Sequence, residues 1–227
     1  MIWPTICIDD FFINLKEVVK FANSLSYKSA PGGEWPGERA PFMHTIDPDF
    51  FHQVGSKIVS VLYPNEWTSL CWNAEMTFQR IDSRWQGEGW VHQDSPNKEI
   101  SCIIYLDGDE NCGTSLYKQI HYSSIQHGDK ENSLSKIKKD SNRDPSQMKS
   151  KLYREGVKKN NSRFKKTVTF DSVPNRCIIF DSSNFHAVNS FNSSKNKNRL
   201  TLITFFEHLS RAKPSSLKYP GEECRRL

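Results

Sequence analysis

The sequence predicts a mostly β domain in which a double-sheet jelly roll, or double-stranded β-helix, is buttressed by helices. From about residue 68 onward, short apolar or alternating segments recur and are separated by glycine-containing turns, which is typical of strands in series. Apolar residues at helical spacing occur near the N-terminus. A chain of 227 residues can bury a sizeable core and suits one domain of this class. We therefore expect a single domain over residues 1–227.

Residues 1–66 predict a strand followed by two helices that pack on one sheet. The first strand is expected within residues 4–12, and Asn14 is a suitable N-cap for the helix that follows it. Asp47 is the expected N-cap of the second helix, with Pro48 at its first position. Both helices carry apolar residues on one face, so we expect them to support the sheet rather than to stand in solvent.

Two separated ranges, 67–118 and 167–207, predict the jelly-roll core. Apolar runs and partial alternation indicate its strands, which we expect near residues 70–80, 100–106, 114–118, 167–171, 176–181 and 199–206. No internal repeat is visible.

Residues 119–166 form a basic insertion between two of these core strands. From residue 118 to residue 166 the chain has fourteen Lys and Arg against five Asp and Glu, and few apolar residues. Two interpretations remain open: a solvated, partly disordered segment, or a mobile lid or basic arm with a function. We predict a flexible lid. A helix beginning at Asp144 and Pro145 would carry on one face Met148, Leu152 and Tyr153.

Two histidines and a carboxylate predict a metal site. His92 and Asp94 follow a glycine turn and precede an apolar strand, and His186 lies beside a later strand. Two imidazoles and one carboxylate are the facial ligand set of non-haem Fe(II). A second His-x-Asp pair, His127 and Asp129, lies in a Lys-rich stretch without strand pattern. Because metal ligands need packed supporting elements, we assign the site to His92, Asp94 and His186.

Arg199 predicts a carboxylate-binding position near this site. It begins an apolar strand, and a guanidinium binds a carboxylate through two parallel hydrogen bonds. Thr201 lies two residues later, on the same strand face. Tyr105, at the end of another strand, is a further donor, although a purely structural role is open for it. Trp90 precedes His92 and is expected in a pocket wall or in the core.

This pattern resembles the Fe(II)- and 2-oxoglutarate-dependent dioxygenases, in particular their prolyl-4-hydroxylase-like branch, over roughly residues 76–206. The resemblance rests on His92-x-Asp94, on His186, and on Arg199-x-Thr201. Tyr105-Leu106 and the later Cys112-Gly113-Thr114-Ser115-Leu116-Tyr117 are similar to a second family stretch. The chain departs from the family in having Cys112-Gly113 where Gly-Gly is usual, and in a longer gap between His186 and Arg199.

The resemblance implies Fe(II) on His92, Asp94 and His186, which would be the catalytic centre. It also implies 2-oxoglutarate held by Arg199, Thr201, Tyr105 and Thr114, molecular oxygen as a cosubstrate, and ascorbate as an optional one. The implied reaction is hydroxylation of an aliphatic carbon in a prolyl or other amino-acid residue of a peptide, or in a free amino acid. Asp94 favours hydroxylation, because halogenating relatives replace this carboxylate by a small residue.

Two other classes of protein remain as alternatives. A non-catalytic, cupin-like jelly-roll protein would explain the strands and the aromatic residues, but not Arg199-x-Thr201 after His186. A nucleic-acid-binding protein would use the basic insertion, but a net charge of +5 is modest and no nucleic-acid motif is present.

The cysteine pattern and the N-terminal sequence indicate where in the cell the protein is expected. The six cysteines form no Cys-x-x-Cys pair, so zinc is not indicated, and we expect free thiols in a reducing compartment. The N-terminus lacks the features of a signal peptide, and no apolar run is long enough to span a membrane. We expect a cytoplasmic monomer that acts on a peptide, a protein or a small amino acid.

Overall fold

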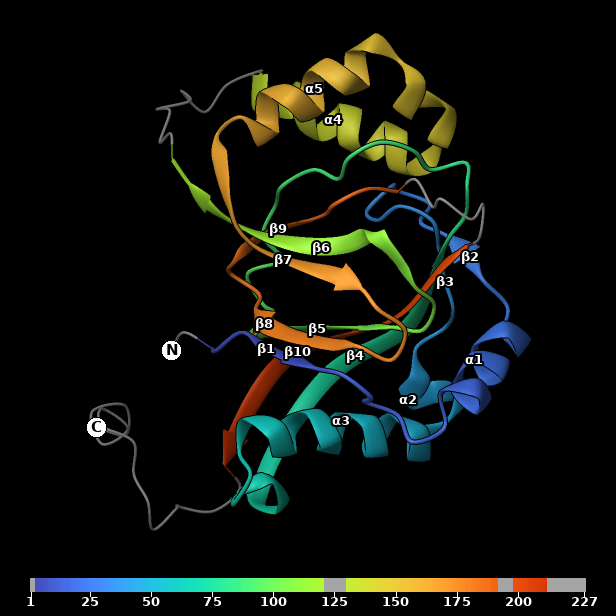
Figure 1. Ribbon diagram of the computed structural model, residues 1–227, viewed down its shortest axis with the longest axis vertical. Coiled ribbons are helices and arrows are strands. Elements are labelled where there is room, and N and C mark those ends of the chain that lie inside the picture. The colour runs from blue at the N-terminus through green and yellow to red at the C-terminus, as the bar shows by residue number, and fades with distance from the viewer. Residues whose placement is uncertain (1–2, 121–129, 192–197, 212–227) are drawn as a thin grey trace.

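Two antiparallel sheets face each other and form a jelly roll in the computed structural model, which describes residues 3–120, 130–191 and 198–211 (Figure 1). The larger sheet has the strand order β1-β8-β5-β10-β4-β3-β2, and the smaller sheet has the order β7-β6-β9. The predicted fold class is therefore confirmed. The strands span Ile6–Ile8 (β1), Lys28–Ser29 (β2), Glu38–Arg39 (β3), Leu70–Ile81 (β4), Ile100–Tyr105 (β5), Asp109–Gln119 (β6), Phe164–Ser172 (β7), Cys177–Asp181 (β8), Phe185–Val188 (β9) and Arg199–Arg211 (β10).

The N-terminal helices cover the outer face of the larger sheet (Figure 1). They span Leu15–Ser24 (α1), Met43–Ile46 (α2) and Pro48–Leu62 (α3), and a short 3-10 helix follows at Trp67–Ser69 (η1). Both predicted caps are confirmed: the Asn14 side chain accepts a hydrogen bond from Glu17 N, and that of Asp47 accepts one from Phe50 N at 2.9 Å. The apolar face of α3 packs with strand residues into the main core, which includes Ile58, Met76, Phe78, Leu202 and Phe206.

Strand β10 is the central element that brings distant residues together. It pairs with β4 on one side and with β5 on the other, so that Thr201 lies opposite both Gln79 and Tyr105. In the smaller sheet, β6 pairs with β9 and places Leu116 opposite His186. The inner faces of both sheets thereby surround one space.

The insertion contains three helical elements. They span Lys130–Arg143 (α4), Pro145–Lys149 (η2, a 3-10 helix) and Lys151–Asn161 (α5), and they lie together beyond the smaller sheet (Figure 1). Residues of this segment and of the jelly roll share a second apolar cluster, whose buried members are Ile81, Trp85, Trp90, Met148, Tyr153, Val157 and Phe191. The described part of the insertion is thus packed on the jelly roll, and its motion as a lid stays a prediction.

The prediction of which residues of this segment are buried was wrong at one position. Met148 and Tyr153 are buried, but the Leu152 side chain is 62% exposed. The reason is that Asp144 caps η2, and Ser150 then caps a new helix, α5. Because the two residues belong to different elements, the helical spacing from Met148 to Leu152 does not place them on one face.

Two further expectations can be compared with the described residues. Cys7, Cys71, Cys102, Cys112 and Cys177 are all free thiols. None of the described helices is long and apolar enough to cross a membrane.

Candidate metal centre

His92, Asp94 and His186 come together at one end of the jelly roll. One ligand atom from each residue lies within 4.8 Å of those of the other two. His92 N donates to His186 O at 3.0 Å and His186 N donates to His92 O at 2.8 Å, so a two-residue bridge joins the segment before β5 to β9. Asp94 N donates to Ser182 O at 3.1 Å. Backbone pairing therefore fixes all three positions.

Both imidazoles are oriented by hydrogen bonds to backbone carbonyls. His92 Nδ1 lies 2.8 Å from Trp90 O, and His186 Nδ1 lies 2.9 Å from Asn184 O. A carbonyl can only accept, so each Nδ1 carries a proton, and Nε2 is the nitrogen of each ring left to bind a metal. Burial, together with the positive charge of Lys138, holds the pKa of His92 well below its usual value, which keeps this ring neutral. Second bonds of this type are usual for metal-bound histidines.

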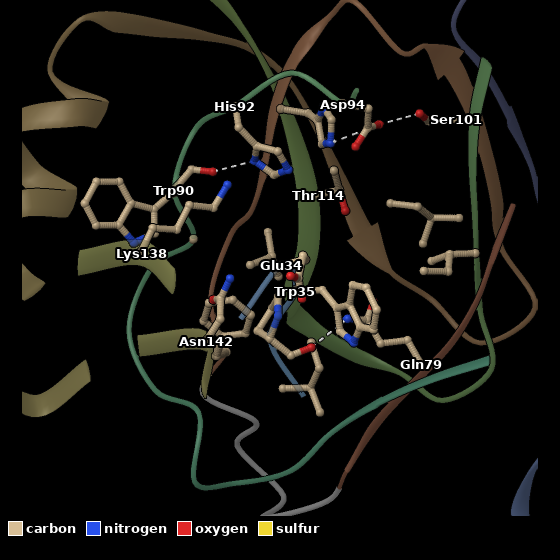
Figure 2. Close-up of a pocket in the computed structure, with 18 of the residues that line it drawn as sticks. Glu34, Trp35, Gln79, Trp90, His92, Asp94, Ser101, Thr114, Lys138 and Asn142 are labelled. Atoms are coloured by element: carbon tan, nitrogen blue, oxygen red, sulfur yellow. Dashed lines mark hydrogen bonds and ion pairs between the residues drawn. The ribbon is translucent and has the colours of Figure 1, made fainter. Parts of the chain in front are cut away.

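The Asp94 carboxylate accepts a hydrogen bond from one hydroxyl group. Ser101 Oγ donates a hydrogen bond to Asp94 Oδ2 and lies 2.7 Å from Ser182 Oγ. Asp94 Oδ2 is 3.6 Å from His186 Nε2 (Figure 2). The three residues thus offer two imidazole nitrogens and one oriented carboxylate, which is a donor set that fits Fe(II).

A cavity of about 350 Å³ opens beside these residues. Its walls come from both sheets, from the loop that contains Glu34 and Trp35, and from the insertion (Figure 2). The residues that line it include Trp35, Arg39, Gln79, Trp90, Ser101, Ile103, Thr114, Lys138, Asn142, Tyr153, Phe180, Phe191, Arg199 and Phe205. A volume of this order suits a small ligand.

Arg199 lies in this cavity wall as a buried cation. Its side chain is largely buried, and its Nε donates to Cys112 O at 3.0 Å. Its guanidinium carbon lies 5.6 Å from the centre of the Tyr105 ring. No described carboxylate forms an ion pair with it. A buried guanidinium of this kind is suited to an exogenous carboxylate.

Thr114, Tyr105 and Thr201 surround Arg199 in different ways. Thr114 lines the cavity, and its hydroxyl accepts a 2.8 Å hydrogen bond from Tyr105 Oη. Tyr105 and Thr201 are fully buried and are not among the residues that line the cavity. The Thr201 hydroxyl has no hydrogen-bond partner within the described chain. Direct contact of Tyr105 or Thr201 with a cosubstrate stays a prediction.

Trp90 is a wall of the cavity and also the support for the insertion. Its indole is buried and meets the Tyr153 ring edge-on, with the ring centres 5.9 Å apart. Gly156 of α5 lies directly over it, because a Cβ at this position would be 2.9 Å from Trp90 Cη2. The rival pair His127 and Asp129 lies outside the described residues.

Sequence reasoning missed two cations that line the same cavity, Arg39 and Lys138. Arg39 belongs to a strand of two residues, and Lys138 is one of many lysines in the insertion. Neither stands in a local pattern that points to a site. Only the tertiary packing of β3 and α4 brings them near Asp94.

Fold and site together define a jelly-roll protein with a His-Asp-His candidate metal centre and a buried arginine in one cavity. The sequence family described as "Family of unknown function (DUF6445)" matches residues 3–206, and the chain belongs to this family. No curated protein matches the chain.

Solved structures share the fold at low sequence identity. HygX from Streptomyces hygroscopicus, with nickel, 2-oxoglutarate and hygromycin B bound, is 12% identical with a TM-score of 0.54; the match covers 89% of this chain and 82% of HygX. EvdO2 from Micromonospora carbonacea var. aurantiaca is 10% identical with a TM-score of 0.52, covering 93% and 90%. SnoN, a non-haem α-ketoglutarate-dependent epimerase from nogalamycin biosynthesis, is 10% identical with a TM-score of 0.50, covering 89% and 76%.

Proposed function

We propose that this protein is an Fe(II)- and 2-oxoglutarate-dependent oxygenase. The observation that carries the proposal is the placement of His92, Asp94, His186 and Arg199 around one small cavity. The first three offer the ligands of non-haem iron, and the fourth offers a buried positive charge that has no carboxylate partner among the described residues. A fold shared with HygX, whose structure contains nickel and 2-oxoglutarate, agrees with this assignment.

The residues would divide the work as follows. His92, Asp94 and His186 would hold the metal, which with 2-oxoglutarate and oxygen supplies the oxidising power for hydroxylation. Arg199 would bind the distal carboxylate of 2-oxoglutarate through charge-assisted hydrogen bonds. Tyr105 would act on this site indirectly, through its hydrogen bond to Thr114.

Tyr105 Oη donates to Thr114, so the Thr114 hydroxyl proton is free to be donated into the cavity. Trp90 and Phe191 close part of the cavity wall with apolar surface, which limits the entry of water. Cosubstrate binding would therefore depend on one buried cation, one hydroxyl group and apolar wall residues that limit the entry of water.

The proposed reaction is hydroxylation of an aliphatic carbon, with a prolyl or other amino-acid residue, or a free amino acid, as substrate. Asp94 supports hydroxylation, because a carboxylate at this position occupies the place that a halide would need. The modest size of the cavity supports a small substrate or one residue of a peptide.

Two measurements test the proposal. Purified protein should convert 2-oxoglutarate to succinate in the presence of Fe(II) and oxygen, and at least a slow, uncoupled rate is expected without substrate. His92→Ala and Asp94→Ala should each abolish or severely weaken Fe(II) binding while the far-ultraviolet spectrum is retained. His127→Ala is the matched control, since it belongs to the rival His-x-Asp pair.

Normal Fe(II) affinity in His92→Ala, or loss of affinity only in His127→Ala, would show that His92 and Asp94 are not the metal-binding pair. If no variant affects metal binding and no succinate forms, the non-catalytic jelly-roll alternative is favoured instead.

A further inference from the structure

Two cations besides Arg199 line the cavity of the candidate metal centre. Arg39 comes from β3, at the edge of the larger sheet, and Lys138 comes from α4 of the insertion. In Figure 2 the Lys138 side chain extends past Trp90 with its amine directed toward the His92 ring. Elements far apart in the sequence thus direct two positive charges into the space next to the metal ligands.

Arg39 is stacked and only partly satisfied. Its guanidinium carbon lies 4.2 Å from the Trp35 ring centre and 5.9 Å from that of Phe205. Its Nε is inaccessible to solvent and has no hydrogen-bond partner among the described residues. Burial lowers the pKa of Arg39 to about 10, against the opposing effect of the Asp94 and Glu75 carboxylates. Stacking fixes the plane of the guanidinium and leaves its edge donors for a ligand.

Lys138 differs from its neighbours on α4. Lys136 is exposed and forms an ion pair with Asp140 at 2.9 Å, and Lys139 is exposed. Lys138 is half-buried and forms no hydrogen bond or ion pair with any described residue. Burial lowers its pKa to about 8, with Asp94 acting in the opposite direction. A half-buried lysine without a carboxylate partner loses part of its hydration without a compensating contact, so its placement calls for a function.

The charges of the loaded site leave these two cations uncompensated. Asp94 is the carboxylate that acts on both of them, but as a ligand it would be neutralised by the divalent metal. The two negative charges of 2-oxoglutarate would be balanced by Arg199 and by the remaining charge of the metal. Glu34, on the cavity wall, is exposed and can offset at most one positive charge. The site would therefore retain net positive charge where the substrate must bind.

We propose, on the basis of the function proposed above, that Arg39 and Lys138 bind an anionic group of the substrate. A carboxylate or a tetrahedral oxyanion such as a phosphate or sulfate ester would satisfy both cations through charge-assisted hydrogen bonds. The substrate is then a free amino acid, a chain-terminal residue or another small anionic molecule. A neutral residue inside a peptide would cover both half-buried cations without pairing them, which disfavours that choice.

The experiment uses full-length protein loaded with Zn(II), as a redox-inert metal, and with saturating 2-oxoglutarate. The probes are N-acetylglycine, its neutral partner N-acetylglycinamide, and inorganic sulfate. The readout is the indole N–H resonance of Trp35 in a proton–nitrogen correlation spectrum, assigned with Trp35→Phe. Saturating 2-oxoglutarate keeps the probes away from Arg199.

We expect at least one anion to shift the Trp35 resonance saturably, and the neutral amide to bind at least about tenfold more weakly. The double variant Arg39→Gln/Lys138→Gln should lose this preference for the anion. The double variant Arg154→Gln/Lys139→Gln removes the same charge from exposed positions of the insertion and should behave as wild type. The carboxylate and sulfate arms distinguish the two anion chemistries.

In the wild-type protein, equal binding of N-acetylglycine and N-acetylglycinamide, or no saturable shift with either anion, would be enough to overturn the inference. An unchanged preference in Arg39→Gln/Lys138→Gln would also overturn it. Failure of Zn(II) and 2-oxoglutarate to bind at all would instead overturn the proposed function, so the two failures are distinguishable.

Discussion

The C-terminal end of α5 holds the backbone that leads into the candidate metal centre. Asn161 Oδ1 accepts from Val91 N at 3.0 Å, and Asn161 Nδ2 donates to Gly89 O at 3.0 Å. Asn160 Nδ2 donates to Val91 O at 3.0 Å. Within the described residues, the segment before His92 has no neighbouring strand on the side that faces α5. These side-chain amides supply the hydrogen-bond partners that such a strand would supply. We therefore predict that Asn161→Ala weakens both folding stability and metal binding.

The expected magnitude follows from the groups that lose their partners. Gly89 and Val91 are buried, so the substitution leaves one backbone N–H and one backbone C=O unsatisfied. Each such group costs about 1–3 kcal/mol, and we expect a loss of roughly 2–6 kcal/mol in the free energy of unfolding of the metal-free protein. Metal affinity should fall about tenfold or more, the range found when a group supporting a metal ligand is lost.

Urea denaturation of the metal-free protein measures the first effect, and titration with Fe(II) under anaerobic conditions measures the second. Lys159→Ala, at an exposed position of the same helix, is the matched control and should change stability by less than about 0.5 kcal/mol. If Asn161→Ala unfolds and binds metal like the control, α5 does not support the metal centre.

Three further predictions test the packing and charge of the insertion by urea denaturation. Gly156→Val should cost about 1–3 kcal/mol, because its Cβ would meet Trp90; wild-type stability would show that the helix is not seated there. Met148→Ala should cost about 2–5 kcal/mol, whereas Leu152→Ala at an exposed position should be nearly neutral, and the reverse order would contradict the observed face. Lys138→Met should stabilise the metal-free protein at pH 7 by up to about 3 kcal/mol. The folded-state pKa of Lys138 is about 8, below the usual 10.5, so between pH 8 and pH 10.5 the unfolded chain binds more protons than the folded chain. The stability of the wild type therefore rises with pH over this range, and the stability advantage of the variant should shrink. An advantage that is independent of pH would contradict this.

The jelly roll and the triad were predictable because their signals are local. Asn14 and Asp47 cap helices through contacts three residues away, and strands are visible as short apolar runs. His92 and Asp94 lie two residues apart, and only their partner His186 had to be placed by fold class. Residue type, order and strand position sufficed to predict that these three residues come together, and their binding of a metal stays a prediction.

The cavity wall that contains Arg39 and Lys138 was not predictable in the same way. Arg39 lies in a two-residue strand, and its environment depends on Trp35 and on Phe205, which lies more than 160 residues away. Lys138 is one of several lysines on α4, and only the packing of that helix separates it from Lys136. Leu152 was misassigned because a change from 3-10 helix to α-helix shifts the face without a clear sequence signal.

One titration tests the central claim, that a metal on His92, Asp94 and His186 and a carboxylate on Arg199 share one cavity. 2-Oxoglutarate is added anaerobically to the Fe(II)-loaded protein, and the weak visible charge-transfer band is recorded. Wild type should give a saturating band. Arg199→Gln should retain Fe(II) but require about 10- to 150-fold more 2-oxoglutarate, because a charge-assisted contact contributes roughly 1.5–3 kcal/mol. Arg84→Gln, at an exposed position, should titrate as wild type. The absence of a band in wild type, or the same curve in Arg199→Gln, would contradict the account.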